Sequence, residues 1–223
     1  MVTTKITVKW SKDIMTKRIC AKVSLSALKN NIEEVLKKAA GKDVVAVIKA
    51  DAYGHGAKEA AEVFKDIAHF FAVATADEAL ELRSFGVKKD ILILAPVPFE
   101  DVEPLIKENI TLTVSDLTMA EEISIVASDL GKKAKIHVAI DSGMNRIGFM
   151  PGEDSVNKIV EISNLPNISL EGIFTHFAKA DEKDKTSMNR QSDVFEDFCR
   201  KILGVVYIRQ IFLKAFKEIV ASF

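Results

Sequence analysis

The chain has 223 residues, which suits one domain of the size of a small α/β barrel and leaves no room for a second full domain. Its 31 Lys and Arg residues against 32 Asp and Glu residues give a net charge of −1, so the basic excess of a nucleic-acid-binding protein is missing. An apolar fraction of 48% is enough for a packed core and excludes an intrinsically disordered chain.

Cysteine content and hydropathy favour a cytoplasmic protein. Cys20 and Cys199 are too few for a disulfide framework, and neither lies in a closely spaced metal-binding pattern, so we expect no metal site. The first 17 residues lack the apolar core of a signal peptide, and no stretch approaches the length of a membrane span. We therefore expect contact with neither a membrane nor a nucleic acid.

Short apolar runs alternate along the chain with segments of helical period. The predicted strands are 19–24, 44–50, 70–75, 91–95, 110–114, 136–141 and 170–176. One predicted helix carries apolar residues from Leu28 to Ala39 and ends at Gly41, and another begins at Ser115 as its N-cap and ends at Gly131. This order predicts a parallel sheet, either doubly wound or closed as a (β/α)8 TIM-type barrel.

A dinucleotide site is disfavoured, because the glycines at 54 and 56 are not followed by a third at the required offset.

Two segments differ from the alternation of strands and helices. Residues 179–193 are polar and free of glycine, which predicts an exposed loop leading into a helix around Val194. Residues 200–223 are basic and apolar and differ from everything before them.

Lys49 is the first candidate for chemistry, since it follows an apolar strand where a free ammonium group is costly to bury. An ordinary lysine there would extend its head group to water. The alternative is a lysine that loses its proton readily and forms a Schiff base. Its surroundings, VVAVIKADAYGHGA at 44–57, favour the alternative.

That segment resembles the alanine racemase family, and three further blocks agree in the right order. They are AIDSGMNRIGF at 139–149, GIFTHFAKAD at 172–181 and ICAKVSLSALKNNI at 19–32. The resemblance implies a barrel that binds pyridoxal 5'-phosphate covalently on Lys49, with Tyr53 bound to the cofactor phosphate and His176 against its pyridine ring. It further implies that Arg146 binds the substrate and that Lys49 is the catalytic base on the D face of alanine.

The implied activity is the interconversion of L-alanine and D-alanine, which supplies D-alanine to cell-wall peptidoglycan, in an enzyme that forms homodimers. His55, His69 and His137 have no matching context, and we expect them to be structural. The described motifs do not distinguish alanine from serine as the substrate.

Three departures from the family pattern limit what the resemblance implies. Ala139 stands where many members carry a carbamylated lysine beside the arginine. The alanine-asparagine-serine segment that binds phosphate and the arginine that faces the pyridine nitrogen are missing from 199–223. The C-terminal β-domain, whose tyrosine is the second base, is also absent, and Tyr207 is no credible replacement.

We therefore expect an N-terminal extension at 1–17, a partial barrel of about six β/α units at 18–198 and a divergent tail at 199–223, with a frameshift or stop near residue 199. The leading hypothesis is an alanine racemase with little or no activity. One alternative is a stand-alone, single-barrel protein that binds pyridoxal phosphate without racemising, although its glycine-glutamate-asparagine run is not found. Another is a non-functional truncation product.

Overall fold

The strands of the protein run parallel, and each of the first six is followed by a helix. A computed structural model describes residues 21–208 and 210–214. The strands are β1 (Ala46–Val47), β2 (Phe71–Val73), β3 (Ile91–Ile93), β4 (Leu112–Val114), β5 (Ala134–Ile140), β6 (Ile168–His176) and β7 (Gln210–Lys214). The helices are α1 (Leu25–Lys38), α2 (Lys49–Gly54), α3 (Ala57–Phe64), α4 (Ala76–Ser84), α5 (Phe99–Lys107), α6 (Leu117–Asp129), α7 (Glu153–Ser163) and α8 (Thr186–Leu203).

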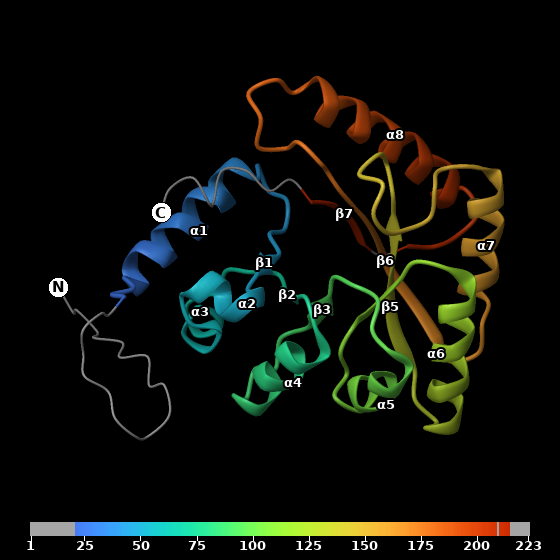
Figure 1. Ribbon diagram of the computed structural model, residues 1–223, viewed down its shortest axis with the longest axis horizontal. Helices are drawn as coiled ribbons and strands as arrows, with labels where there is room; N and C mark the ends of the chain where they lie inside the picture. Colours follow the sequence, from blue (N-terminus) through green and yellow to red (C-terminus); the bar gives the residue numbers. More distant parts are fainter. Residues whose placement is uncertain (1–20, 209, 215–223) are drawn as a thin grey trace.

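The strands form one curved row in chain order. The strands of this row are hydrogen-bonded as β1-β2-β3 and as β4-β5-β6-β7, and a parallel bridge between Leu92 and Thr111 joins the two groups. A doubly wound sheet reverses its strand order at a switch point, whereas a TIM-type barrel keeps the chain order. Figure 1 shows the row sweeping from β1 to β7, with α6 and α7 outside β5 and β6. The fold is therefore an incomplete (β/α) barrel, as predicted.

Both faces of the short strands are buried, which explains their continuous apolar sequences. Phe71, Val73 and Ile93 face the helices and belong to the large core. Phe70, Ala72 and Leu92 face the other way and form a second cluster with neighbouring valine and leucine side chains. The alternation of side chains along each strand thus fills the helix layer and the barrel interior at once.

Three predicted boundaries are wrong for local reasons. Residues 21–24 of the predicted first strand are not in a strand, because Ser24 caps α1 by accepting the Ala27 N–H at 3.2 Å, and residues 19–20 lie outside the described residues. Asp116 rather than Ser115 caps α6, since its carboxylate accepts the Met119 N–H at 2.9 Å. Ala40, with a φ of 50°, takes the left-handed position after α1 that was predicted for Gly41.

The predicted loop at 179–193 is half helix. α8 begins at Thr186, whose backbone N–H and hydroxyl both donate to the Asp184 carboxylate, at 2.9 and 2.6 Å. Gln191 is buried on the inner face of α8 together with Phe195 and Phe198. A buried glutamine interrupts the apolar period, so the pattern hides the first two turns of this helix.

The segment predicted as a divergent tail continues the sheet. β7 pairs in parallel with β6, with Gly172 opposite Gln210 and His176 opposite Lys214. A strand at this position satisfies backbone groups that the edge of β6 would otherwise leave unpaired. None of the helices in the described part of the chain is long and apolar enough to cross a membrane.

Candidate active site

Lys49 lies at the carboxyl end of β1, where barrel enzymes carry their active sites. It follows the last strand residue, Val47, by two positions and is partly buried. The ladder between β1 and β2 ends with a hydrogen bond from the Ile48 N–H to the Ala72 carbonyl at 2.9 Å. Lys49 is therefore fixed at its base by the sheet while its own chain segment turns away from β2.

The chain turns at this point through a left-handed helical turn. Ala50, Asp51, Ala52 and Tyr53 all have φ between 51° and 56°, and none of them is a glycine or an asparagine. Left-handed backbone costs roughly 1–2 kcal/mol for each such residue. Surrounding contacts must hold the turn in place, because its own sequence disfavours it.

Hydrogen bonds close this turn from both sides. The Asp51 carboxylate accepts the Ala57 N–H at 2.6 Å, and the Gly56 N–H donates to the Asp51 carbonyl at 2.9 Å. The Nδ1 atom of His55 lies 2.8 Å from the Ala52 carbonyl oxygen. Tyr53 emerges from the turn with 47% of its surface exposed. These contacts thus fix the backbone that carries Tyr53, four residues after Lys49.

Arg146 lies in a loop that the Asp141 carboxylate organises from within. This carboxylate accepts the backbone N–H groups of Gly143, Asn145 and Arg146 at 2.9, 2.9 and 2.7 Å. Burial acts to raise the pKa of Asp141, but these hydrogen bonds outweigh it and hold the pKa below its ordinary value. The loop that carries the exposed Arg146 side chain therefore has a defined conformation.

The same loop returns to β5 by a close backbone approach. The Phe149 N–H donates to the Ala139 carbonyl at 2.9 Å, and the Asp141 N–H donates to the Phe149 carbonyl at 3.0 Å. A Cβ atom on Gly148, which has a φ of 113°, would lie 2.6 Å from the Ala139 carbonyl oxygen. Only glycine fits this position, so Gly148 sets where the loop ends.

His176 ends β6 beside this loop. A small hollow is lined by Ala139, Asp141, Met144, Arg146, Phe174 and His176, among others. The buried hydroxyls of Ser142 and Thr175 lie 2.8 Å apart and join the two segments beneath it. The structure thus brings Arg146 and His176 to one hollow, with the small side chain of Ala139 beside them.

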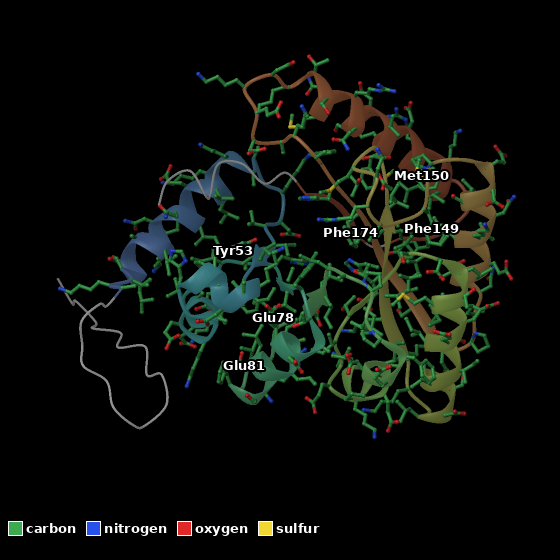
Figure 2. The ribbon with its side chains drawn as sticks, in the orientation of Figure 1. Tyr53, Glu78, Glu81, Phe149, Met150 and Phe174 are labelled. Carbon is green, nitrogen blue, oxygen red and sulfur yellow. The ribbon has the colours of Figure 1, made fainter. Side chains whose placement is uncertain are left out.

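Lys49 and Tyr53 lie outside the lining of this hollow, on the β1 side of the same row of strands. Figure 2 labels Tyr53 and Glu78 on the half of the molecule formed by the first strands, and Phe149 and Phe174 on the other half. All four predicted residues share the carboxyl-terminal end of the parallel strands, since each follows or ends its strand. The mouth of the barrel therefore carries an amine, a phenol, a guanidinium and an imidazole.

His137, which the sequence leaves as structural, lies inside the barrel. Its exposed fraction is 2%, and its ring meets that of Phe70 edge-on at 6.0 Å between centroids. Gly172 provides the space, because a Cβ atom there would lie 2.7 Å from the imidazole. Burial lowers the pKa of His137 to about 4, so the ring is neutral at pH 7.

Sequence reasoning missed two carboxylates that organise the mouth. Asp141 lies within the segment 139–149 but carries no obvious signal for its three backbone contacts. Glu78 does carry one, because Thr75 and Glu78 have the spacing of a capping box at the start of α4. The same carboxylate also reaches the N–H of Ala50 at 2.7 Å, which no local pattern indicates.

Fold and site together define an α/β-barrel domain with a lysine at the end of its first strand and an arginine and a histidine at later strand ends. The sequence profile of the family described as "Alanine racemase, N-terminal domain" matches residues 23–211. The chain belongs to this family. The match runs past the predicted barrel boundary at residue 198 and into β7.

Individual relatives agree with this assignment. The chain is 44% identical over 187 residues to an alanine racemase of Clostridium perfringens strain SM101. The aligned region covers 83% of this chain and 48% of that protein. It is 44% identical over 182 residues to an alanine racemase of Methanococcus maripaludis, covering 81% and 49%. The chain spans about half the length of the curated relatives it matches.

Solved structures show the same relationship. The alanine racemase of Clostridium difficile 630 superposes with a TM-score of 0.79 at 43% identity, covering 85% of this chain and 50% of that one. A histidine racemase from Leuconostoc mesenteroides has a TM-score of 0.80 at 28% identity, covering 86% and 51%. Proteins named for different amino acids thus share this half of the fold.

Proposed function

We propose that this chain is the cofactor-binding half of a pyridoxal phosphate-dependent alanine racemase. The observation that carries the proposal is the arrangement of Lys49, Tyr53, Arg146 and His176 at one end of the parallel strands, in segments that resemble those of the family. Alanine is the proposed substrate because the most similar relatives reported above, at 44% identity, are named for it. The proposed wider role is the supply of D-alanine for peptidoglycan in the cytoplasm.

The side chains at the mouth fit the cofactor's chemical groups. A lysine amine condenses with an aldehyde, a phenol donates to a phosphate, and an imidazole contacts an aromatic ring. Lys49, Tyr53 and His176 would hold pyridoxal phosphate in these three ways. When bound, the cofactor acidifies the Cα–H bond of an amino acid by delocalising the resulting negative charge.

The protein's own residues then have defined tasks. Arg146 offers a planar fork of donors for the substrate carboxylate, and the Asp141 loop holds its backbone. Lys49 accepts the Cα proton on one face as a general base. Tyr207, the other tyrosine, is 88% exposed after α8 and does not line the mouth. Racemisation needs a base on each face of the Cα atom, and among the described residues we assign only Lys49 to this role. We therefore propose that this chain alone racemises alanine weakly.

Chemical labelling of Lys49 tests the proposal. Incubation with pyridoxal phosphate followed by borohydride reduction should place the label on Lys49, as read by peptide mass spectrometry. Lys49→Ala should lose this label, whereas Lys42→Ala, which removes an exposed lysine after α1, should keep it. Equal labelling of many lysines that Lys49→Ala leaves unchanged would refute the proposed function.

A second candidate function is a stand-alone protein that binds the cofactor without racemising. The structure favours it in one respect, because the described residues provide groups for the cofactor but a single base. Exchange of the Cα proton of D-alanine separates the two functions, because a racemase half would exchange it and a protein that only binds the cofactor would not.

A further inference from the structure

The Glu78 carboxylate joins the ends of two strands at the mouth. Its Oε1 atom accepts the Ala50 N–H at 2.7 Å, directly after Lys49. Its Oε2 atom accepts the N–H groups of Ala74 at 2.7 Å and Thr75 at 3.3 Å, directly after β2. One partly buried side chain on α4 thus holds three backbone donors from two segments.

The Glu78 carboxylate lies where the pairing between β1 and β2 ends. β1 and β2 pair through Ala46 with Phe71 and Val47 with Ala72, and the Ile48 N–H makes the last ladder bond. The left-handed turn then carries the chain away from β2, so the Ala50 N–H no longer faces a strand carbonyl. Glu78 accepts this hydrogen bond in place of the sheet, and a bond to a charged acceptor is stronger than a neutral one.

Glu78 also acts on Tyr53 at the other end of the turn. Burial first, and then the negative charge of Glu78, raise the pKa of Tyr53 above its ordinary value. A phenol that keeps its proton remains a hydrogen-bond donor. Figure 2 shows Tyr53 and Glu78 on the same half of the molecule.

We propose that Glu78 is the positioning residue of the mouth, which orients Lys49 and Tyr53 together by fixing the left-handed turn between them. The inference rests on the proposed function for the roles of these two side chains. It goes beyond it by assigning their alignment to a residue on a different helix, 29 positions after Lys49 in the sequence. Glu78 itself does not contact the cofactor in this proposal.

The first test needs no cofactor. In a Tyr207→Phe background Tyr53 is the only tyrosine, so ultraviolet absorbance reports its ionisation alone. Glu78→Gln should move this titration to lower pH and should speed amide hydrogen exchange in the peptide that spans residues 49–54. Glu81→Gln removes a charge from an exposed position on the same helix and should change neither readout.

The second test measures the reactivity of Lys49. Glu78→Gln should raise the pyridoxal phosphate concentration that half-saturates labelling of Lys49 by about tenfold, the equivalent of one lost charge-assisted hydrogen bond. Thr75→Ala is the matched control, because it removes the other half of the capping box and leaves the bond from Glu78 to Ala50. It should lower stability without changing the half-saturating concentration.

The outcomes separate the two proposals. If Lys49 of the unchanged protein is not labelled, the proposed function fails, and the exchange and titration results alone decide whether Glu78 fixes the turn. If Lys49 is labelled equally in Glu78→Gln and the unchanged protein, the positioning role is refuted while the proposed function stands. Equal effects of Thr75→Ala and Glu78→Gln would also refute it, because helix capping alone would then explain the loss.

Discussion

The Asp141 carboxylate accepts the backbone N–H of Arg146 at 2.7 Å, so the residue that would bind substrate is held through its main chain. Two further N–H groups of the same loop, from Gly143 and Asn145, share this acceptor. A carboxylate with three backbone donors fixes the loop more firmly than any side-chain contact of the exposed guanidinium could. We therefore expect a substitution of Asp141 to change the free energy of unfolding more than it changes the affinity for substrate.

Asp141→Asn should lower the free energy of unfolding by about 2 kcal/mol, because an amide nitrogen replaces one acceptor and faces backbone donors. Urea denaturation at pH 7 measures the change. Asp129→Asn, at an exposed position at the end of α6, is the control and should cost less than about 0.5 kcal/mol. Equal losses in both variants would contradict the organising role of Asp141.

Gly148→Ala should destabilise the protein by about 3 kcal/mol, because a Cβ atom meets the Ala139 carbonyl oxygen in an unfavourable backbone conformation. Gly131→Ala separates the two causes. Gly131 also has a positive φ, of 60°, but nothing lies within 4 Å of its added Cβ atom. Thermal unfolding should show a loss of about 1 kcal/mol for Gly131→Ala. A similar loss for both would mean that the close approach is easily relieved.

Stability should depend on pH through His137. Its pKa falls from 6.5 in the unfolded chain to about 4 in the fold, so the unfolded chain binds the proton more tightly. The contribution of the neutral ring is fully present above pH 6.5 and is lost as pH falls toward 4, by about 3 kcal/mol in total. His137→Leu should flatten this part of the profile in denaturation at pH 4–8. An unchanged slope would show that His137 is not the titrating group.

Proton exchange should differ between the two enantiomers of alanine. With pyridoxal phosphate present, the chain should exchange the Cα proton of D-alanine for deuterium about 10²-fold faster than that of L-alanine, because Lys49 is the base assigned to the D face. Nuclear magnetic resonance follows the loss of the Cα–H signal. Lys49→Ala should abolish exchange and Lys42→Ala should not. Equal exchange of both enantiomers would reveal a second base.

The sequence alone predicts the strands well where their signal is local. The apolar runs at 70–75 and 91–95 contain β2 and β3, because strands buried on both faces require continuous apolar residues. Three of the four segments that resemble the family, at 44–57, 139–149 and 172–181, lie at the same carboxyl-terminal end of the sheet. The family and the barrel fold are confirmed by the profile match and the solved structures.

The features that the sequence does not predict depend on contacts distant along the chain. The left-handed turn from Ala50 to Tyr53 contradicts local preference, and its support includes Glu78 on α4. β7 pairs with the edge of β6, a contact between distant segments that the sequence of residues 200–223 does not indicate. The roles of Lys49, Tyr53, Arg146 and His176 remain predictions, since shared position at the mouth does not test their chemistry.

Because the turn is helical, the number of residues between Lys49 and Tyr53 determines the direction in which the Tyr53 side chain points. A left-handed helix mirrors the right-handed one, so each residue advances the direction of the side chain by about 100°. Three such steps separate Ala50 from Tyr53, about 300° in all, so the direction of the phenol depends on the number of residues in the turn. Deleting or inserting a single alanine here would turn the direction of the Tyr53 side chain by about 100° while every named side chain was still present. We therefore expect a change of length to be tolerated less well than a substitution of Ala50 or Ala52.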